Sequence, residues 1–285
     1  MPYESPAALR VALEARLRQE AAGRGVRPDR LRRRAVFERL LVRLDAAGPG
    51  AWVLKGGTAL EVRWHERARA TRDLDLALRE PPADGTALRE LLIAQLADDV
   101  DGDRFSFQVG APRPLAEDLA GRPGWRFPIR AMLAGREFAA VRVDVVLRSE
   151  ELLATERLRL PGALAFAGFP DRDVEVVTPA QHFAEKLHAL TRRYPDRDNT
   201  RVRDLVDLVL LIQDGALTPA EAWQVSRHVF AARATHELPA EIPDPPASWA
   251  PTYATLAGEL GVQAGSLADA MERLRRFWAD ARASA

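Results

Sequence analysis

The chain has 285 residues, 47% of them hydrophobic and 29% charged, and its 41 basic residues balance 41 acidic ones. This length fits about two domains, and the zero net charge excludes a generally basic nucleic-acid-binding protein, so that only a local patch could bind RNA or DNA. The absence of cysteine excludes disulfides and zinc–thiolate sites, and the lack of any long apolar stretch predicts a cytoplasmic protein without membrane contact.

Two helices are predicted in residues 1–50, where apolar side chains recur at helical spacing before Gly48-Pro49-Gly50 ends the segment. We expect these helices to pack on a mixed α/β core that spans residues 51–177. Helices in this core are indicated from about residue 58 and over residues 88–96. Short apolar or alternating segments indicate its strands at 51–54, 74–78, 105–109, 125–133, 141–147 and 174–177.

Residues 178–285 predict a separate helical domain. Thr178-Pro179 and Thr218-Pro219 each place a cap residue before a proline at the first helical position, and Gly215 ends the helix between them. The predicted fold class is therefore α+β, as a bilobed chain with a small mixed sheet followed by a C-terminal helical bundle.

Three aspartates stand out on two of the predicted strands. Asp73 and Asp75 lie two residues apart, so their carboxylates leave one face of a strand while leucines fill the other, and Asp144 repeats this pattern on a later strand. Parallel carboxylates repel each other unless a cation lies between them, and oxygen ligands suit a hard divalent ion. The three aspartates are predicted to form a Mg²⁺ site suited to in-line phosphoryl or nucleotidyl transfer, with solvated strand residues as the alternative.

A glycine pair follows the first predicted strand of the core. Gly56-Gly57-Thr58 lies between this strand and a helix, where backbone amides can approach a phosphate and the helix N-terminus favours an anion. Neither the P-loop spacing nor the dinucleotide-binding spacing of glycines is present. Taken alone, the pair usually marks only a turn.

In their order along the chain, these motifs resemble the nucleotidyltransferase superfamily with the DNA polymerase β fold. Four segments are similar to one branch of it, the AbiEii/MenT toxins of type IV toxin–antitoxin systems: VLKGGTAL at 53–60, TRDLDL at 71–76, AEKLHAL at 184–190 and RDLVDL at 203–208. The resemblance spans residues 51–212. It implies a polymerase β-like core, an NTP substrate and a cognate antitoxin.

The resemblance also implies roles for single residues. It implies that Gly56, Gly57 and Thr58 contact the triphosphate and that Asp73, Asp75 and Asp144 bind the metal. It further implies that Lys186 contacts the nucleotide phosphates and that Asp204 or Asp207 completes the catalytic residues. From spacing alone, Lys186 could instead form a plain salt bridge, because Asp204 and Asp207 lie three residues apart and can share a face of the next helix.

These observations predict a metal-dependent nucleotidyltransferase that acts as a toxin. A hydroxyl would attack the α-phosphate of an NTP bound with one or two Mg²⁺ ions, and pyrophosphate would leave. By resemblance, the acceptor is the 3′ end of tRNA, so that added nucleotides block aminoacylation and translation. The alternatives are a small-molecule nucleotidyltransferase, such as one that modifies an antibiotic, and a non-enzymatic binding module on the same fold. A monomer is expected.

Thr71 lies two residues before Asp73 and, by strand alternation, would project to the same face as Asp73 and Asp75. Its hydroxyl is therefore expected to border the nucleotide and the metal. A phosphate on Thr71 would add about −1.5 to −2 charges beside carboxylates that already repel each other. This predicts silencing by an antitoxin that phosphorylates Thr71, and the alternative is a β-branched residue that only begins the strand.

Overall fold

The computed structural model describes residues 3–80, 82–115, 124–146, 149–192 and 199–284. It divides the chain into two compact units. The first unit contains residues 1–65, 70–149 and 156–176, and the second contains residues 66–69, 150–155 and 177–285. The two N-terminal helices therefore belong to the same unit as the sheet, and the main crossing into the second unit lies between Val176 and Val177.

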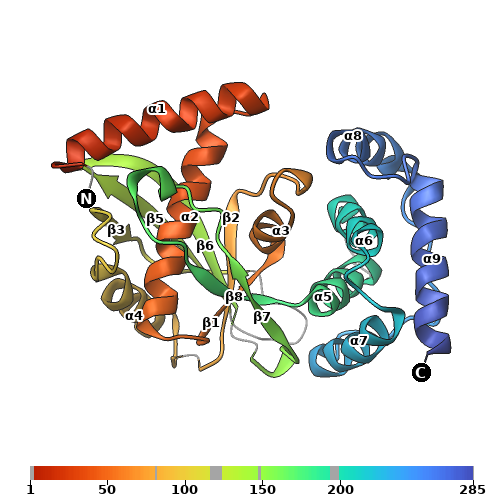
Figure 1. Ribbon diagram of the computed structural model, residues 1–285. Helices are drawn as coiled ribbons and strands as arrows, with labels where there is room; N and C mark the ends of the chain where they lie inside the picture. The colour runs from red at the N-terminus through yellow and green to blue at the C-terminus, as the bar shows by residue number, and fades with distance from the viewer. Residues whose placement is uncertain (1–2, 81, 116–123, 147–148, 193–198, 285) are drawn as a thin grey trace. The chain divides into compact units, whose positions relative to one another are not determined.

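A mixed sheet forms the centre of the first unit (Figure 1). In the described part of the chain its strands follow the order β3-β5-β6-β2-β1-β8-β7, and β4 pairs with β5. Strand β2 pairs with β6 in parallel and with β1 in antiparallel orientation. The strands are β1 (Trp52–Lys55), β2 (Asp73–Leu78), β3 (Phe105–Val109), β4 (Arg113–Pro114), β5 (Gly124–Leu133), β6 (Arg136–Val146), β7 (Thr155–Arg159) and β8 (Asp173–Val177).

Alternation along β2 and β6 determines which side chains reach the core. Leu74 and Leu76 of β2 and Val143 and Val145 of β6 are buried, and the residues between them leave the opposite face of the sheet. Residues that face one another across neighbouring strands point to the same side, so this register brings the intervening polar residues of both strands together on one face.

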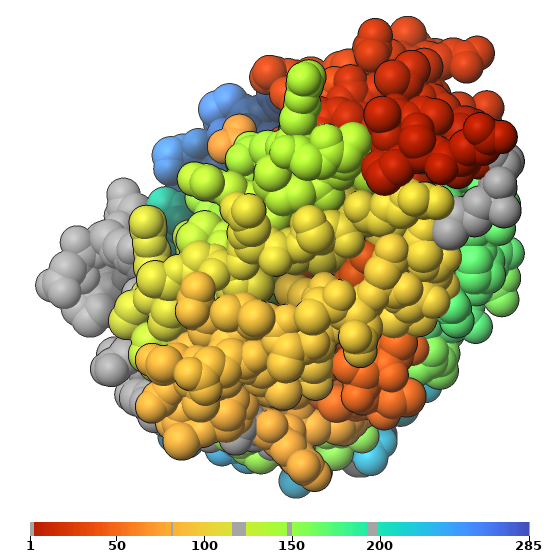
Figure 2. All heavy atoms as spheres, turned by 90° about the vertical axis from the view of Figure 1, so that its left-hand side faces the viewer, coloured from red at the N-terminus to blue at the C-terminus, as the bar shows by residue number. Residues whose placement is uncertain are grey.

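Among the described residues of the first unit, the helices beside this sheet are α1 (Pro6–Arg24), α2 (Pro28–Ala47), α3 (Gly56–Trp64) and α4 (Gly85–Ala97). Helix α2 packs on β6, α4 packs on β3, and α3 packs on β2. Arg10 of α1 donates to the carbonyls of Leu133, Arg136 and Glu137 at the β5–β6 turn, each at 3.0 Å. Figure 2 shows α1, in red, lying against this lime-coloured part of the sheet. The N-terminal helices thus support the strands that carry the polar face.

The second unit is helical. Its helices are α5 (Pro179–Thr191), α6 (Val202–Asp214), α7 (Pro219–Arg233), α8 (Ala250–Leu260) and α9 (Leu267–Ala283). Helix α5 begins at the predicted cap, where the Thr178 hydroxyl accepts the N–H of Gln181 at 3.2 Å. Helices α6 and α7 pack on α5, and α9 packs on both of them. Phe183 and Trp278 lie buried in this core.

The predicted combination of a mixed sheet and a helical C-terminal part is confirmed. Strand β7 and the short strand β4 were not predicted from the sequence, and residues 116–123 lie outside the described residues. Among the helices described, none is both long and apolar enough to cross a membrane.

Candidate functional site

The three predicted aspartates share one face of the sheet in the first unit. Asp75 of β2 lies directly opposite Asp144 of β6, and Asp73 lies opposite Arg142. Asp73 and Asp75 are half-buried, and the side chain of Asp144 is 12% exposed. The structure therefore brings the carboxylates of Asp75 and Asp144 side by side, as the alternation of each strand predicts.

Two arginines bind these carboxylates. Both oxygens of Asp144 accept hydrogen bonds from Arg126 of β5, with Nε at 2.7 Å from Oδ1 and Nη2 at 2.6 Å from Oδ2. Arg142 Nε donates to Asp73 Oδ1 at 2.6 Å. The hydrogen bonds to Asp144 raise the pKa of the Arg126 guanidinium above its ordinary value. Arg126 and Arg142 thus neutralise charge that the sequence alone assigned to a metal.

Lys55 completes the row of charges across the sheet. It lies directly opposite Asp75 in the antiparallel pair of β1 and β2, so the two side chains leave the same face. Lys55 is itself buried. Each of the three carboxylates therefore has a basic residue as a near neighbour on the sheet.

The residue types fit a divalent metal ion, but their present arrangement is that of ion pairs. Half-buried carboxylate oxygens are the donors that Mg²⁺ prefers. Nevertheless, within the described ranges no group of three or more His, Cys, Asp or Glu side chains stands close enough to hold a metal ion. The site can hold Mg²⁺ through Asp73, Asp75 and Asp144 only if Arg126 gives up at least one oxygen of Asp144.

Gly56 is required by its conformation and by its contact with Asp75. Its φ is +60°, in the left-handed region where other residues are strained, and a Cβ there would lie 1.9 Å from Asp75 Oδ2. The first turn of α3 consequently runs against the carboxylate of Asp75. Gly57 is buried in the same turn. The contact with Asp75 therefore excludes a side chain at position 56, in addition to the conformation that the turn itself requires.

The hydroxyls of Thr58 and Thr71 bind the backbone. Thr58 Oγ1 donates to the carbonyl of Asp73 at 3.1 Å, and Thr71 Oγ1 donates to the same carbonyl at 3.3 Å. Because β2 begins at Asp73, strand alternation does not extend back to Thr71 and does not by itself set the direction of its side chain. Both threonines hold the start of β2 in place, and their contact with a nucleotide remains a prediction.

Lys186, Asp204 and Asp207 form a buried ion cluster within the second unit. Lys186 Nζ lies 3.0 Å from Asp204 Oδ1 and 2.6 Å from Asp207 Oδ2. Arg69 binds Asp207 as well, with its Nη2 at 3.0 Å from Oδ2. Arg201 Nη1 lies 3.6 Å from Asp204 Oδ2. The helix spacing thus correctly predicts that one lysine faces both acids.

Burial and charge act in opposite directions on this cluster. Burial alone would lower the pKa of Lys186, but Asp207 and Asp204 outweigh it and raise that pKa above its ordinary value. Burial alone would raise the pKa of Asp204, but Lys186 and Arg201 lower it below the ordinary value. The lysine and Asp204 are therefore both charged at neutral pH, and each depends on the other.

Sequence reasoning missed the arginines that bind the predicted aspartates. Arg142 lies two residues before Asp144 on the same strand, so the alternation that selected Asp144 also places Arg142 on the polar face. Arg126 alternates with buried Phe127 in the same way. Arg69, by contrast, meets Asp207 across 138 residues, and no local signal in the sequence indicates that contact.

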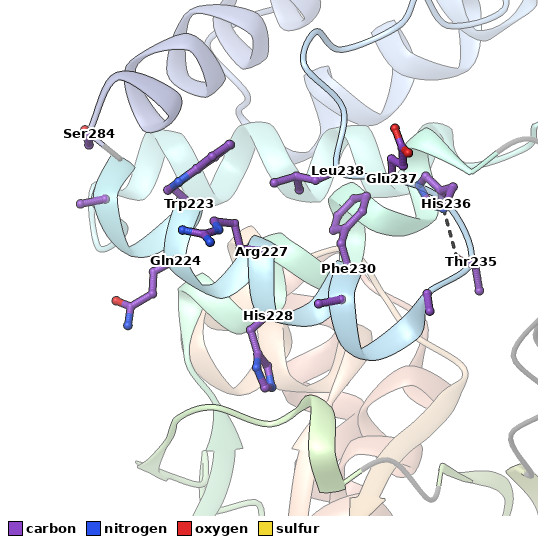
Figure 3. Close-up of a pocket in the computed structure, with 13 residues that line it drawn as sticks. Trp223, Gln224, Arg227, His228, Phe230, Thr235, His236, Glu237, Leu238 and Ser284 are labelled. Carbon is purple, nitrogen blue, oxygen red and sulfur yellow. Dashed lines mark hydrogen bonds between the residues drawn. The ribbon is translucent and has the colours of Figure 1, made fainter.

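A hollow of about 990 Å³ in the second unit lies along α7 and the segment that follows it (Figure 3). Trp223, Arg227, Phe230 and His236 are among its lining residues. The hydroxyl of Thr235 lies 3.2 Å from His236 Nδ1. None of the predicted site residues lines this hollow.

Strand-borne aspartates that face one another across β2 and β6, with a glycine turn against one of them, are the arrangement expected of a nucleotidyltransferase. A family model described as "Nucleotidyl transferase AbiEii toxin, Type IV TA system" matches residues 39–279. The chain therefore belongs to this family of nucleotidyltransferase toxins. Membership implies an NTP substrate and a cognate antitoxin.

Two solved structures are similar to the chain at low identity. JHP933 from Helicobacter pylori is 14% identical, with 88% of this chain and 94% of that chain covered and a TM-score of 0.43. An antigenic nucleotidyltransferase-like protein from Paracoccidioides brasiliensis is 16% identical, with 80% and 92% covered and a TM-score of 0.41. No curated protein matches.

Proposed function

We propose that this protein transfers an NMP from an NTP to the 3′ end of tRNA and releases pyrophosphate, so that aminoacylation and translation stop. The observation that carries the proposal is the opposition of Asp75 and Asp144 on adjacent strands, with the glycine turn of α3 against Asp75. Family membership supports nucleotidyl transfer as the reaction class. The RNA acceptor follows from the sequence resemblance.

The proposed reaction needs charge neutralisation and alignment. Asp73, Asp75 and Asp144 would hold Mg²⁺, which when bound offsets the negative charge of the transferred phosphate. The backbone at Gly56 and Gly57 would let a phosphate approach the N-terminal turn of α3 closely. The terminal hydroxyl of the RNA forms a bond to the α-phosphorus, the bond to pyrophosphate breaks, and the hydroxyl proton passes to a base. Positioning of these groups supplies most of the rate.

Asp144 is a candidate base for the hydroxyl proton, but its surroundings restrict that role. A carboxylate accepts a proton only through a free lone pair in line with the donor. Both oxygens of Asp144 already accept an N–H from Arg126. We therefore assign Asp144 to binding the metal once Arg126 has released at least one of its oxygens, and the hydroxyl proton to water.

We further propose that Lys186 binds phosphate groups of the nucleotide and that Asp204 and Asp207 hold its ammonium group. The support is a cation fixed by two acids at 3.0 and 2.6 Å in a chain that otherwise uses arginine almost throughout. A compact ammonium group is not equivalent to a planar guanidinium in such a position. Asp207, which also binds Arg69, is the stronger candidate for the second acid of the site.

For control, we propose that the antitoxin acts on Thr71 by phosphorylation. The hydroxyl lies within hydrogen-bond distance of the Asp73 carbonyl, at 3.3 Å, and the residue is only half-buried. A phosphate at this point would add about −1.5 to −2 charges next to the metal-binding aspartates. It would also break the hydrogen bond that holds the start of β2.

The experiment is incubation of the purified protein with total tRNA, Mg²⁺ and each labelled NTP in turn, followed by gel analysis. Wild type should label tRNA, and Asp75→Asn should lose the labelling by at least about 100-fold. Asp98→Asn, which removes an exposed carboxylate elsewhere in the first unit, is the matched control and should behave as wild type. In a second reaction with an antibiotic as acceptor, labelling confined to that small molecule would favour the antibiotic-type alternative, and nucleotide binding without any transfer in either reaction would favour the binding module.

A further inference from the structure

The guanidinium group of Arg126 binds both carboxylate oxygens of Asp144. Two parallel hydrogen bonds of 2.7 and 2.6 Å join the guanidinium to both oxygens of a largely buried carboxylate. The pairing is fixed by the backbone, because Arg126 and Asp144 lie directly opposite each other in the antiparallel pair of β5 and β6. Paired charges of this geometry are among the strongest hydrogen bonds in proteins.

The charges on this face already balance without a metal ion. Around the aspartates stand three acidic and three basic side chains: Lys55, Asp75, Asp144 and Arg126 in one row across the strands, and Asp73 and Arg142 in the next. A divalent ion added to this set would bring two uncompensated positive charges. Its coordination by Asp144 would also release a guanidinium group at close range, where like charges repel. Both the uncompensated charge of the ion and its repulsion by the released guanidinium therefore disfavour binding of the metal alone.

A triphosphate removes both obstacles. Its negative charge compensates the incoming cation, and its oxygens accept the two parallel N–H bonds that Arg126 loses from Asp144, because phosphate and carboxylate offer a guanidinium the same fork geometry. The Arg126 side chain is 34% exposed, so a phosphate in solution can reach it. Arg142 binds Asp73 less completely, since it contacts only one oxygen of that carboxylate at hydrogen-bond distance.

We propose that Arg126 is a resident counterion that keeps Asp144 from binding a divalent metal until the phosphates of an NTP draw the guanidinium away, so that metal and nucleotide bind together and not one after the other. This inference rests on the proposed function, because it assumes that Asp144 is a metal ligand in an NTP-dependent site. It makes Arg126 a positioning residue that acts through Asp144.

The test is a titration of the full-length protein with Mn²⁺, in which free ion is measured by electron paramagnetic resonance. Without nucleotide, wild type should bind Mn²⁺ weakly, and Arg126→Ala should bind it at least about tenfold more tightly. After subtraction of the Mn²⁺ that a non-hydrolysable NTP analogue binds in a titration without protein, the analogue should raise the Mn²⁺ affinity of wild type at least about tenfold, and should raise that of Arg126→Ala much less. Such reciprocal coupling is what linkage between the two ligands requires.

Arg130→Ala is the matched control. Arg130 lies on the same strand and on the same face, loses the same charge, and has Glu137 instead of the site aspartates as its neighbour at 3.6 Å. It should bind Mn²⁺ as wild type does. Because Arg126→Ala leaves a buried carboxylate without its partner, Arg126→Gln is measured alongside it, and the coupling in wild type tests the proposal independently of any variant.

Two results would overturn the proposal. One is equal Mn²⁺ affinity in Arg126→Gln and Arg130→Ala, and the other is a wild-type Mn²⁺ affinity that the nucleotide analogue leaves unchanged. Failure of the proposed function has a different signature, in which metal and nucleotide bind with the expected coupling but no nucleotide is transferred to RNA. Transfer to RNA without any coupling would keep the function and remove the role of Arg126.

Discussion

Replacement of Lys186 by methionine tests whether the buried cluster of the second unit is stabilised by charge. Methionine has a similar length but no charge, so Asp204 and Asp207 would lose the ammonium group that lies 3.0 and 2.6 Å away. Removal of one member of a buried ion pair costs about 3–5 kcal/mol. Asp207 keeps Arg69 at 3.0 Å, which places the expected loss near the lower end of that range. Each kcal/mol lowers Tm by roughly 2–4 °C in a protein of this class, so Tm should fall by roughly 6–12 °C.

The pH dependence of this loss identifies its cause. In wild type the lowered pKa of Asp204 gives stability that is present above the ordinary carboxyl range and is lost as pH falls through the native pKa. The raised pKa of Lys186 gives stability that is lost only as pH rises through that native pKa. Between pH 5 and pH 8 both groups are charged, so the contribution of the pair in wild type is constant.

The variant should behave differently over the same range. Without Lys186, burial favours the protonated form of Asp204, which can take up a proton toward pH 5 and so relieve part of the destabilisation. Scanning calorimetry of wild type and Lys186→Met at pH 8 and pH 5 should therefore show a larger difference in Tm at pH 8. Arg203→Met removes one positive charge from an exposed position beside Asp204 and should change Tm little. A Lys186→Met protein within 1 °C of wild type at pH 8, or a difference that grows at pH 5, would refute the reasoning.

Three further outcomes follow from the described contacts. Gly56→Ala should reduce nucleotidyl transfer at least about tenfold. The new methyl group must displace the Asp75 carboxylate, and the left-handed backbone at this position adds about 1–2 kcal/mol of strain for alanine. A wild-type value of kcat/KM would contradict this prediction. Thr71→Glu should be inactive in tRNA labelling, and Thr71→Ala should keep much of its activity. Mass spectrometry of the protein co-expressed with its antitoxin should find phosphate on Thr71. An unmodified Thr71 in a fully neutralised toxin would refute the control proposal. Thr218→Ala should lower the free energy of unfolding by about 1 kcal/mol in urea, because it removes the hydroxyl of a capping box with Glu221, and an unchanged urea midpoint would show that this cap contributes nothing.

Local pattern was sufficient for the elements that carry the aspartates. Leu74 and Leu76 alternate with Asp73 and Asp75 so regularly that the strand and its polar face follow from the sequence. Thr178 predicts the start of a helix because its hydroxyl can satisfy an amide three residues later, and that bond is present. These inferences need only neighbours within a few residues.

The partners of the aspartates could not be predicted in the same way. Arg126 meets Asp144 across the β5–β6 hairpin, and a bulge between Ala131 and Met132 shifts the register of that hairpin away from what its turn alone would set. The expected orientation of Thr71 remains a prediction, because the strand begins at Asp73 and alternation does not apply before it. Charge balance on the polar face therefore required the pairing of four strands to be known.

The central claim is nucleotidyl transfer from an NTP to the 3′ end of tRNA, and sequencing of tRNA 3′ ends tests it most directly. Total tRNA is incubated with Mg²⁺, all four NTPs and either wild-type protein or Asp75→Asn, and the ends are read after adapter ligation. We expect wild type to leave nucleotides added beyond the mature 3′ end on a subset of tRNAs, and Asp75→Asn to leave the ends unchanged. Mature ends in the wild-type reaction, or equal extension by Asp75→Asn, would contradict the account.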